Sequence, residues 1–347
     1  MRSSPILLKG LDFIEYASSE PENLQTLFKN LTFVETARHK DKEVSLFQSG
    51  DCHFVINNQK DSFAQNFSKK HQGPSVCSLG FRVNGSAQKA LDWAVSQGAQ
   101  KVEKDSHSHS FPAIYGVGNS LIYFVDDFSN GGHWKKSFQF HQDAPSQPIF
   151  LSIDHLTNNV PCGEMQKWCD FYQSIFGFTQ RRFFDIKGLK TGLISKVMKS
   201  PCDTITIPIN EPSNDEAGKN SQIQEYLDEY NGSGIQHIAL ETHKIISAIE
   251  LLRKNDLHFL DVPNTYYDML KQRGFTIKEN VESLKKNRIL VDGDEHGYLL
   301  QIFTKNVIGP IFYEVIQRHQ HDGFGEGNFQ ALFDSIERDQ IERGYIK

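Results

Sequence analysis

Three residues in the second half of the chain are of the types that bind a catalytic metal. His155, His237 and Glu314 each stand within an apolar run typical of a β-strand. Two imidazoles and one carboxylate on one face of a metal leave its other positions open. Fe(II) oxygenases use this arrangement because substrate and O2 must both reach the iron, whereas a closed four-ligand site is structural. Long stretches separate the three residues, so a folded sheet must bring them together.

Each of these residues also has an ordinary structural explanation. A histidine in an apolar strand is more often a hydrogen-bonded core residue than a ligand. Glu314 lies within Ile311–Ile316, where strand alternation could turn its side chain toward solvent. If it points inward it needs a partner, because burying a bare charge is costly. The residues alone therefore leave both interpretations open.

Four other histidines are weaker candidates. His107 and His109 lie in a serine-rich polar stretch, which predicts a surface loop. His319 and His321 follow the third apolar run and are also expected in a loop.

The elements that must position the three residues recur along the chain. The strand-like run 11–16 precedes an i, i+3, i+4, i+7 pattern that predicts a helix. The run 150–155 precedes the same pattern, which Gly177 ends. The two sets of apolar helix positions are Leu24, Leu27, Phe28 and Leu31, and Trp168, Phe171, Tyr172 and Ile175.

A second pair of repeats completes this order. Runs 78–83 and 236–241 each precede a helical pattern, whose apolar positions are Ala87, Ala90, Leu91 and Ala94, and Ile245, Ala248, Ile249 and Leu252. Each half therefore contains two strand–helix–strand modules, as expected from duplication. In this alignment Tyr16 stands in place of His155 and Ser78 in place of His237. Only the second half is predicted to bind metal.

Composition narrows the class of protein. A length of 347 residues with 38% apolar residues predicts two domains, and the glycines and prolines between Ser129 and Pro148 predict a linker. A net charge of -6 gives no reason to expect nucleic-acid binding. Five cysteines without a Cys-x-x-Cys spacing argue against disulfides or structural zinc. No signal peptide or apolar run of membrane-spanning length is visible, so we expect no membrane association and a cytoplasmic location.

Several ordered motifs give the second half a family resemblance. They are the runs 152–155, 208–212, 221–226, 234–240, 263–267, 297–305, 312–318 and 323–333. From about Phe150 to Gly344 the chain resembles the 4-hydroxyphenylpyruvate dioxygenase family of the vicinal oxygen chelate superfamily. The first half matches mainly in architecture. Some bacterial members are labelled haemolysins, legiolysin or pigment factors, and air oxidation of homogentisate to a brown melanin suggests why.

The resemblance implies an α+β fold. Four βαβββ modules would form two duplicated halves, each an open barrel-like mixed sheet with helices outside, and a C-terminal lid helix would follow. Residues 1–135 would be a degenerate domain without metal. Residues 149–347 would be the catalytic domain with the lid.

The same resemblance implies the reaction. One Fe(II) per chain would be held by His155, His237 and Glu314. The small-molecule partner 4-hydroxyphenylpyruvate would react with O2 as co-substrate to give homogentisate and CO2, a step of tyrosine and phenylalanine catabolism. No separate 2-oxoglutarate is needed, because the substrate is itself an α-keto acid. Members of the family are commonly homodimers or homotetramers.

The resemblance also implies a substrate pocket. Its polar positions are Ser195, Asn210, Gln222, Gln236 and Gln301, and its aromatic positions are Phe303, Phe312, Phe324 and Phe329. Neutral amides and hydroxyls suit a phenol and a carboxylate without adding a competing charge. Alternatively, Gln222 and Gln236 are surface residues, since alternation from His237 could turn Gln236 outward. The phenylalanines can also serve as core packing.

The C-terminal segment predicts a helix, and the resemblance implies that this helix is the lid. Asn328 is the expected N-cap, and Gly344 the expected end of the helix. Its apolar face would be Phe329, Leu332, Phe333 and Ile336, with Gly325 and Gly327 as a hinge. A lid would keep water from the reaction. The alternative is a terminal helix that only packs.

Other activities remain open. Hydroxymandelate synthase shares the fold and the iron ligands, although Asn210 and Phe329 favour the dioxygenase. An extradiol catechol dioxygenase would not explain the match in the C-terminal segment. A non-enzymatic small-molecule binding module would be expected to lack the ligands.

Overall fold

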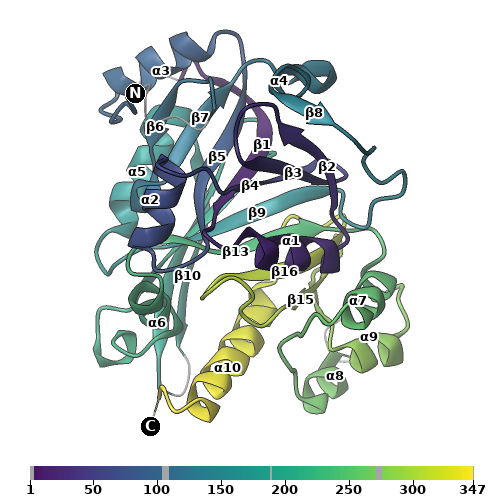
Figure 1. Ribbon diagram of the computed structural model, residues 1–347. Coiled ribbons are helices and arrows are strands. Elements are labelled where there is room, and N and C mark those ends of the chain that lie inside the picture. Colours follow the sequence, from purple (N-terminus) through teal and green to yellow (C-terminus); the bar gives the residue numbers. More distant parts are fainter. Residues whose placement is uncertain (1–3, 104–108, 188–189, 271–275, 347) are drawn as a thin grey trace.

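The computed structural model describes residues 4–103, 109–187, 190–270 and 276–346, and it forms two eight-stranded mixed sheets (Figure 1). The first sheet has the order β6-β7-β5-β1-β4-β3-β2-β8. Its strands are β1 (Leu7–Ala17), β2 (Val34–His39), β3 (Val44–Ser49), β4 (Cys52–Asn57), β5 (Ser75–Asn84), β6 (Ala113–Tyr115), β7 (Leu121–Val125) and β8 (Phe138–Phe140).

The second sheet repeats this plan with the order β10-β11-β12-β9-β13-β16-β15-β14. In both sheets the two modules meet at a central antiparallel pair, β1 with β5 and β9 with β13. The strands of the second sheet are β9 (Ser152–Asn159), β10 (Thr179–Lys187), β11 (Gly192–Lys199), β12 (Thr206–Pro212), β13 (Gly234–Glu241), β14 (Leu290–Gly293), β15 (Tyr298–Phe303) and β16 (Phe312–His319).

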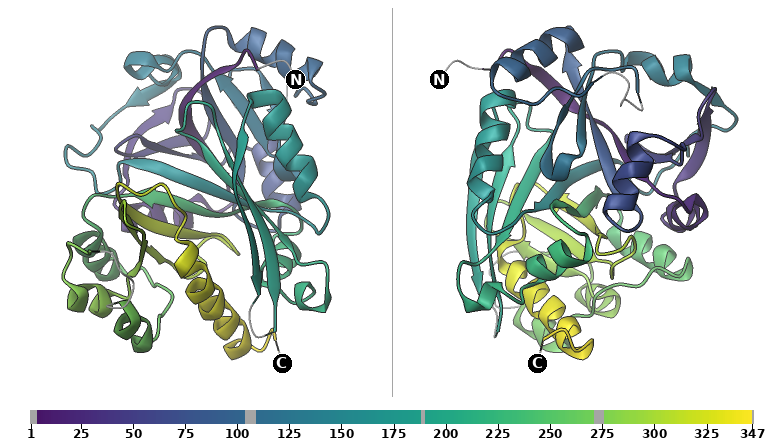
Figure 2. Two further views of the ribbon diagram at one scale, coloured as in Figure 1. Left: turned by 180° about the vertical axis from the view of Figure 1, so that it is seen from behind. Right: turned by 60° about the vertical axis from the view of Figure 1, so that its left-hand side comes forward.

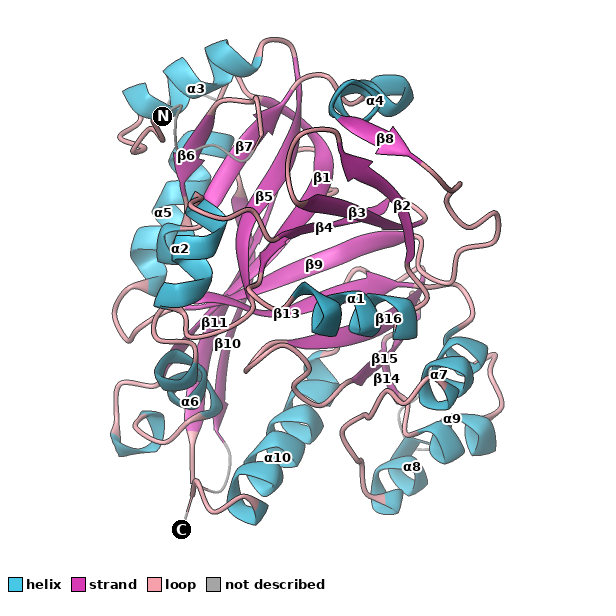
Figure 3. Ribbon diagram, in the orientation of Figure 1, coloured by secondary structure: helices cyan, strands magenta, loops and turns pink. Residues whose placement is uncertain are grey.

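The helices lie outside the two sheets (Figure 3). Helices α7 to α9 gather beside β14 and β15, and α10 runs along the lower side of the second sheet in the two further views (Figure 2). The helices are α1 (Pro21–Asn30), α2 (Phe63–Lys70), α3 (Ala87–Ser96), α4 (Gly132–Ser137), α5 (Met165–Phe176), α6 (Gln222–Glu229), α7 (Ile245–Lys254), α8 (Asn264–Leu270), α9 (Val281–Asn287) and α10 (Glu326–Glu342).

The predicted modular α+β fold is confirmed. Helices α1, α3, α5 and α7 fall on the four amphipathic patterns, and Gly177 ends α5 with a φ of 73°. The linker prediction was partly wrong, because α4 and β8 form within it and β8 pairs with β2. Phe138 and Trp134 are buried, which explains why this stretch folds despite its glycines.

Strand register corrects one detail of the repeat. His237 pairs with Thr157 and Ser78 pairs with Glu15, so Thr157 and Glu15 are counterparts. Two residues earlier on each strand, His155 corresponds to Phe13 and not to Tyr16. The same reasoning through Gly80 makes Tyr123 the counterpart of Glu314. The counterparts of His155 and Glu314 in the first half are therefore two aromatic residues, Phe13 and Tyr123, whose ring centroids lie 6.0 Å apart.

A single buried core joins the two sheets. Tyr16 of β1 and Tyr313 of β16 are fully buried, and their hydroxyl oxygens lie 2.8 Å apart in a hydrogen bond. Phe54 stacks on Tyr313 with ring centroids 5.9 Å apart. A buried hydroxyl needs a partner, and here each tyrosine supplies the other's. This contact fixes the strand that carries Glu314 against the first half.

Among the described residues, no helix combines the length and apolar character that crossing a membrane requires.

Candidate metal centre

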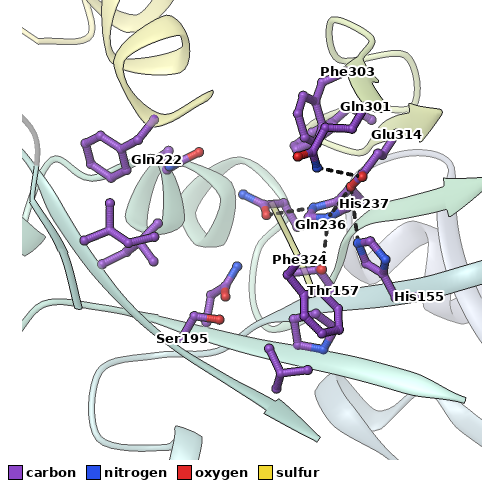
Figure 4. A pocket seen from close by; sticks show the side chains of 17 residues that line it. His155, Thr157, Ser195, Gln222, Gln236, His237, Gln301, Phe303, Glu314 and Phe324 are labelled. Atoms are coloured by element: carbon purple, nitrogen blue, oxygen red, sulfur yellow. Dashed lines mark hydrogen bonds and ion pairs between the residues drawn. The ribbon is translucent and has the colours of Figure 1, made fainter. Parts of the chain in front are cut away.

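Three central strands of the second sheet bring the candidate ligands together. His155 lies on β9, His237 on β13 and Glu314 on β16, and their side chains point toward one another (Figure 4). One donor atom of each lies within 4.8 Å of the others. Because β13 pairs with both β9 and β16, three residues far apart in the sequence become neighbours across the sheet.

The donors are buried and face one another closely. His155, His237 and Glu314 are 5%, 9% and 1% exposed. One carboxylate oxygen of Glu314, Oε2, lies 3.2 Å from Nε2 of His155 and 3.7 Å from Nε2 of His237. Two imidazole nitrogens and one carboxylate oxygen, all from one side, fit a divalent ion that keeps open positions. The outward orientation considered for Glu314 is excluded.

Hydrogen bonds orient all three donors, and that of His237 places its Nδ1 3.2 Å from Oε1 of Gln236. Gln301 donates from Nε2 to Oε1 of Glu314 at 3.0 Å, leaving Oε2 facing the histidines. Nδ1 of His155 lies 2.7 Å from Oδ1 of Asp154. A carboxylate on the far nitrogen of an imidazole fixes the tautomer that presents the other nitrogen to a metal.

The two histidines have opposite electrostatic environments. Burial lowers the pKa of His155, but Glu314 and Asp154 raise it by more, to about 9. Burial and the charge of His155 lower the pKa of His237 well below its usual range. Without metal, the proton of the pair therefore resides on His155, between its two carboxylates. A cation at this point would replace that proton.

A pocket opens beside the three donors, and eight of the nine residues expected to bind substrate line it. They are Ser195, Asn210, Gln222, Gln236, Gln301, Phe303, Phe312 and Phe324. The ninth, Phe329, is in α10, but its side chain lies outside the described part of the structure. Figure 4 shows Ser195 and Gln222 across the pocket from the donors.

Strand alternation accounts for most of this lining. On β11, β12, β15 and β16, residues two apart face the pocket, as Phe312 and Glu314 do. Gln236 breaks the rule, because it precedes His237 directly and still lines the pocket. The pairing of β13 with β9 shifts register between Ile235 and His237. Such a bulge turns two consecutive side chains to one face, so the surface interpretation of Gln236 was wrong.

The pocket contains residues that the sequence did not single out as site residues. Thr157 places its hydroxyl 3.0 Å from Nε2 of His237, and two-residue spacing from His155 could have predicted it. Phe333, expected only as part of an apolar helix face, also lines the pocket. The remaining additions are Ile186, Leu193, Val197 and Pro208.

Helix α10 covers the pocket, but it begins earlier than expected. It starts at Glu326, so Asn328 lies within its first turn and is not the N-cap. The Asn328 side chain instead donates to Oε1 of Gln301 at 2.9 Å and accepts from the hydroxyl of Tyr266. Gly325 precedes the helix with a φ of 74°, and a Cβ there would lie 1.9 Å from Oε1 of Gln301. Glycine is required at this close approach.

Three of the other four candidate histidines are described, and none of them belongs to the group of metal-binding side chains. His107 lies outside the described residues. His109 was expected on the surface, but its side chain is only 6% exposed and its Nε2 lies 3.6 Å from Oε1 of the buried Glu15. His319 is the last residue of β16 and lies 2.8 Å from a Glu279 oxygen. His321 follows that strand, as expected.

Comparison with known proteins agrees with this architecture. Residues 3–139 match the family described as hydroxyphenylpyruvate dioxygenase, N-terminal. Residues 152–302 match the glyoxalase/bleomycin resistance protein/dioxygenase superfamily. The fold also resembles a mutant of 4-hydroxymandelate synthase from Streptomyces coelicolor, with a TM-score of 0.84 and 23% identity over 96% of this chain and 99% of that one.

The curated relatives cover the whole chain. Hemolysin VllY of Vibrio vulnificus is 46% identical over 99% of this chain and 98% of its own length. The 4-hydroxyphenylpyruvate dioxygenase of Pseudomonas aeruginosa is 44% identical over 99% of this chain and 97% of its own. The duplicated fold and its three-donor centre thus define a dioxygenase of the glyoxalase/bleomycin resistance superfamily. Within it, the chain belongs to the 4-hydroxyphenylpyruvate dioxygenase family.

Proposed function

We propose that this chain is an Fe(II)-dependent 4-hydroxyphenylpyruvate dioxygenase that converts 4-hydroxyphenylpyruvate and O2 to homogentisate and CO2. The observation that carries the proposal is the buried cluster of His155, His237 and Glu314 at the end of a pocket whose other lining is neutral. Full-length similarity to curated dioxygenases of this name supports the choice of substrate.

The donor set supports Fe(II) as the metal. Two histidines and one carboxylate on one face suit a redox-active iron that binds other molecules at its open positions. When bound, Fe(II) would supply those positions to the α-keto acid and to O2, together with the redox chemistry of decarboxylation and hydroxylation. Glu314 would hold the ion with the carboxylate oxygen that faces both histidines, while Gln301 keeps the other oxygen occupied.

The neutral polar residues would hold the far end of the substrate. Ser195 and Gln222 lie across the pocket from the donors, which suits them to hydrogen-bond the phenol hydroxyl. Asn210, whose side chain donates to Oδ1 of Asn159 at 3.3 Å, keeps its carbonyl oxygen for a further donor. None of these groups carries a charge, so none would compete with the metal for the substrate carboxylate.

Aromatic side chains would align the ring between these two ends. Phe312 stacks on the His237 imidazole with centroids 4.9 Å apart, and Phe324 lies edge-on to His155 at 5.6 Å. Phe303 packs at right angles to the His237 ring. These contacts leave an apolar passage that excludes water, with Phe333 of α10 closing it. We propose that α10 acts as the lid over this passage.

The division of labour between the halves belongs to the same proposal. Residues 1–135 would be the metal-free domain and residues 149–347 the catalytic domain. Phe13 and Tyr123 at the counterpart ligand positions support this division, and the pairing of β8 with β2 would extend the first domain to Phe140. We also propose a homodimer or homotetramer and a cytoplasmic location. Free cysteines throughout the chain support the location.

Oxygen uptake tests the proposal. The metal-free protein is loaded anaerobically with Fe(II) or with Zn(II), mixed with 4-hydroxyphenylpyruvate, and followed with an oxygen electrode. We expect oxygen uptake with Fe(II) but not with Zn(II). We expect none when 3-phenylpropionate, which has no α-keto group, replaces 4-hydroxyphenylpyruvate. Equal uptake with both metals, or none from a folded iron-loaded sample, would refute the assignment.

A further inference from the structure

Asp154 is held between a candidate metal ligand and an arginine. Its Oδ1 lies 2.7 Å from Nδ1 of His155 and accepts from Nη2 of Arg318 at 2.8 Å. Its Oδ2 accepts from Nε of Arg318 at 2.6 Å. This two-pronged pairing fixes both the position and the plane of the carboxylate, because the guanidinium is rigid and planar.

The third nitrogen of Arg318 contacts the approach to α10. Nη1 donates to the backbone carbonyl of His321 at 3.0 Å and to that of Gly323 at 2.6 Å. The guanidinium carbon lies 5.8 Å from the ring centroid of Phe324, which lines the pocket. One side chain therefore holds the carboxylate behind His155 and the segment that leads into the lid helix.

A second hydrogen-bonded chain runs from another ligand to the same segment. Glu314 accepts from Gln301, and Oε1 of Gln301 accepts from Asn328 in the first turn of α10. Gly325 lies against the same oxygen of Gln301. The start of α10 is thus connected to two of the three donors, on one side through Arg318 and on the other through Gln301.

The first half has the same acid–arginine pair without these connections. Asp12 is the counterpart of Asp154 and accepts from Nε of Arg82 at 2.9 Å. The residue after Asp12 is Phe13, and the imidazole that Oδ2 of Asp12 contacts, at 2.8 Å, is that of His133, which is not a candidate metal ligand. The terminal nitrogens of Arg82 pair with Asp51 on the surface and not with backbone carbonyls. Arg82 therefore provides a matched control inside the same chain.

We propose that Arg318 is a positioning residue that orients His155 through Asp154 and couples occupancy of the metal site to closure of α10. The inference rests on the proposed metal centre but not on the identity of the substrate. A metal that fixes the His155 ring also fixes Asp154 and the guanidinium, and with it the two carbonyls that precede the helix. Removing the guanidinium leaves all three donors in place but breaks one of their two connections to the lid, while the connection through Gln301 remains.

Arg318→Gln and Arg82→Gln test this coupling. Fe(II) is titrated anaerobically against a competing chelator, and hydrogen exchange of residues 326–342 is measured with and without Fe(II). In the native protein we expect Fe(II) to slow exchange in this segment. Arg318→Gln should weaken Fe(II) binding about 10–100-fold, as loss of a hydrogen-bonding partner of a ligand does. At saturating Fe(II) it should show less slowing than the native protein, because only the connection through Gln301 remains. Arg82→Gln should behave as the native protein in both measurements.

Native affinity together with native slowing in Arg318→Gln would overturn the inference. If that variant does not fold, Asp154→Asn, which removes one charge and keeps the shape, is measured instead with the same expectations. Arg318→Lys should give Fe(II) affinity and exchange close to those of Arg318→Gln, because one ammonium group cannot replace the planar guanidinium. Full recovery of the native values by lysine would refute positioning by geometry. Iron binding with lid protection but no O2 uptake would refute the substrate proposal alone, whereas a native protein that binds no Fe(II) would refute both.

Discussion

Gln236 and His237 are consecutive residues of β13, yet both side chains line the same pocket, with Oε1 of Gln236 3.2 Å from Nδ1 of His237. The register shift beside Gln236 makes this arrangement possible. The bulge thus adds a neutral amide to the substrate pocket immediately next to a metal ligand.

Replacing that amide should weaken substrate binding without removing a metal ligand. In Gln236→Leu we expect the KM for 4-hydroxyphenylpyruvate to rise about tenfold, since a lost hydrogen bond is worth about 1.5 kcal/mol. At saturating Fe(II) the iron content should stay at about one per chain, because Gln236 is not a ligand, although losing this partner of His237 should weaken the affinity for Fe(II). Steady-state kinetics and metal analysis measure the two effects. Gln224→Leu is the control, because Gln224 bonds Asp228 on the exposed face of α6. An unchanged KM in Gln236→Leu would contradict the assigned role.

Removing one donor charge should abolish metal binding. In Glu314→Gln the carboxylate between the two Nε2 atoms is lost, and we expect Fe(II) per chain to fall from about one to near zero after desalting. Glu15→Gln removes the buried carboxylate at the counterpart of Thr157 and should bind iron normally. Metal analysis of the two purified variants tests this prediction. Iron loss in both variants would point to a general effect of burying an amide, not to a ligand.

Glu15 should make the protein sensitive to acid. Burial raises its pKa, but His109, Ser78 and Asn57 lower it by more, to about 2, from an ordinary value of 4.5. Its stabilising effect is therefore full above about pH 5 and is lost as the pH falls toward 2. Between pH 7 and pH 3 the free energy of unfolding should fall by roughly 2 kcal/mol more in the native protein than in Glu15→Gln. Urea titrations measure this difference, and parallel pH profiles would contradict it.

The lid should depend on one buried carboxylate of α10. Oε1 of Glu337 accepts from the backbone N–H groups of Lys190 and Thr191 and from the Thr191 hydroxyl, each at 2.9 Å. Glu337→Gln should weaken these bonds by about 2 kcal/mol and speed hydrogen exchange in α10. Arg338→Gln, an exposed change on the same helix, should leave exchange unaltered. Native exchange in Glu337→Gln would show that the helix is held mainly by other contacts.

Periodicity was sufficient to predict the modules and to mark the candidate ligands, but their choice as ligands also depended on the family resemblance. Leu24 to Leu31 and Trp168 to Ile175 predicted α1 and α5 because a helix facing a sheet needs a continuous apolar stripe. His155, His237 and Glu314 stood out because polar residues inside apolar strands need a reason to be there. These features are local, so the sequence contains them.

The features that were missed depend on partners distant in sequence. His109 looked like a loop residue, but Glu15 lies beside it in the folded sheet. Asn328 looked like an N-cap, but its amide bonds Gln301 and Tyr266. The counterpart of His155 is Phe13 and not Tyr16, because strand register determines which residues are equivalent. The weak sequence similarity between the two halves does not define that register.

The central claim is that the pocket directs O2 into the aromatic ring of 4-hydroxyphenylpyruvate, and product identification under ¹⁸O₂ tests it most directly. The Fe(II)-loaded enzyme is given the substrate and ¹⁸O₂, and the product is separated and its mass is determined by mass spectrometry. We predict homogentisate carrying one labelled oxygen on the ring and one in the carboxylate, with one CO2 released per O2 consumed. Labelled 4-hydroxymandelate would contradict the claim. That product would support the proposed iron centre but refute the role assigned to the pocket.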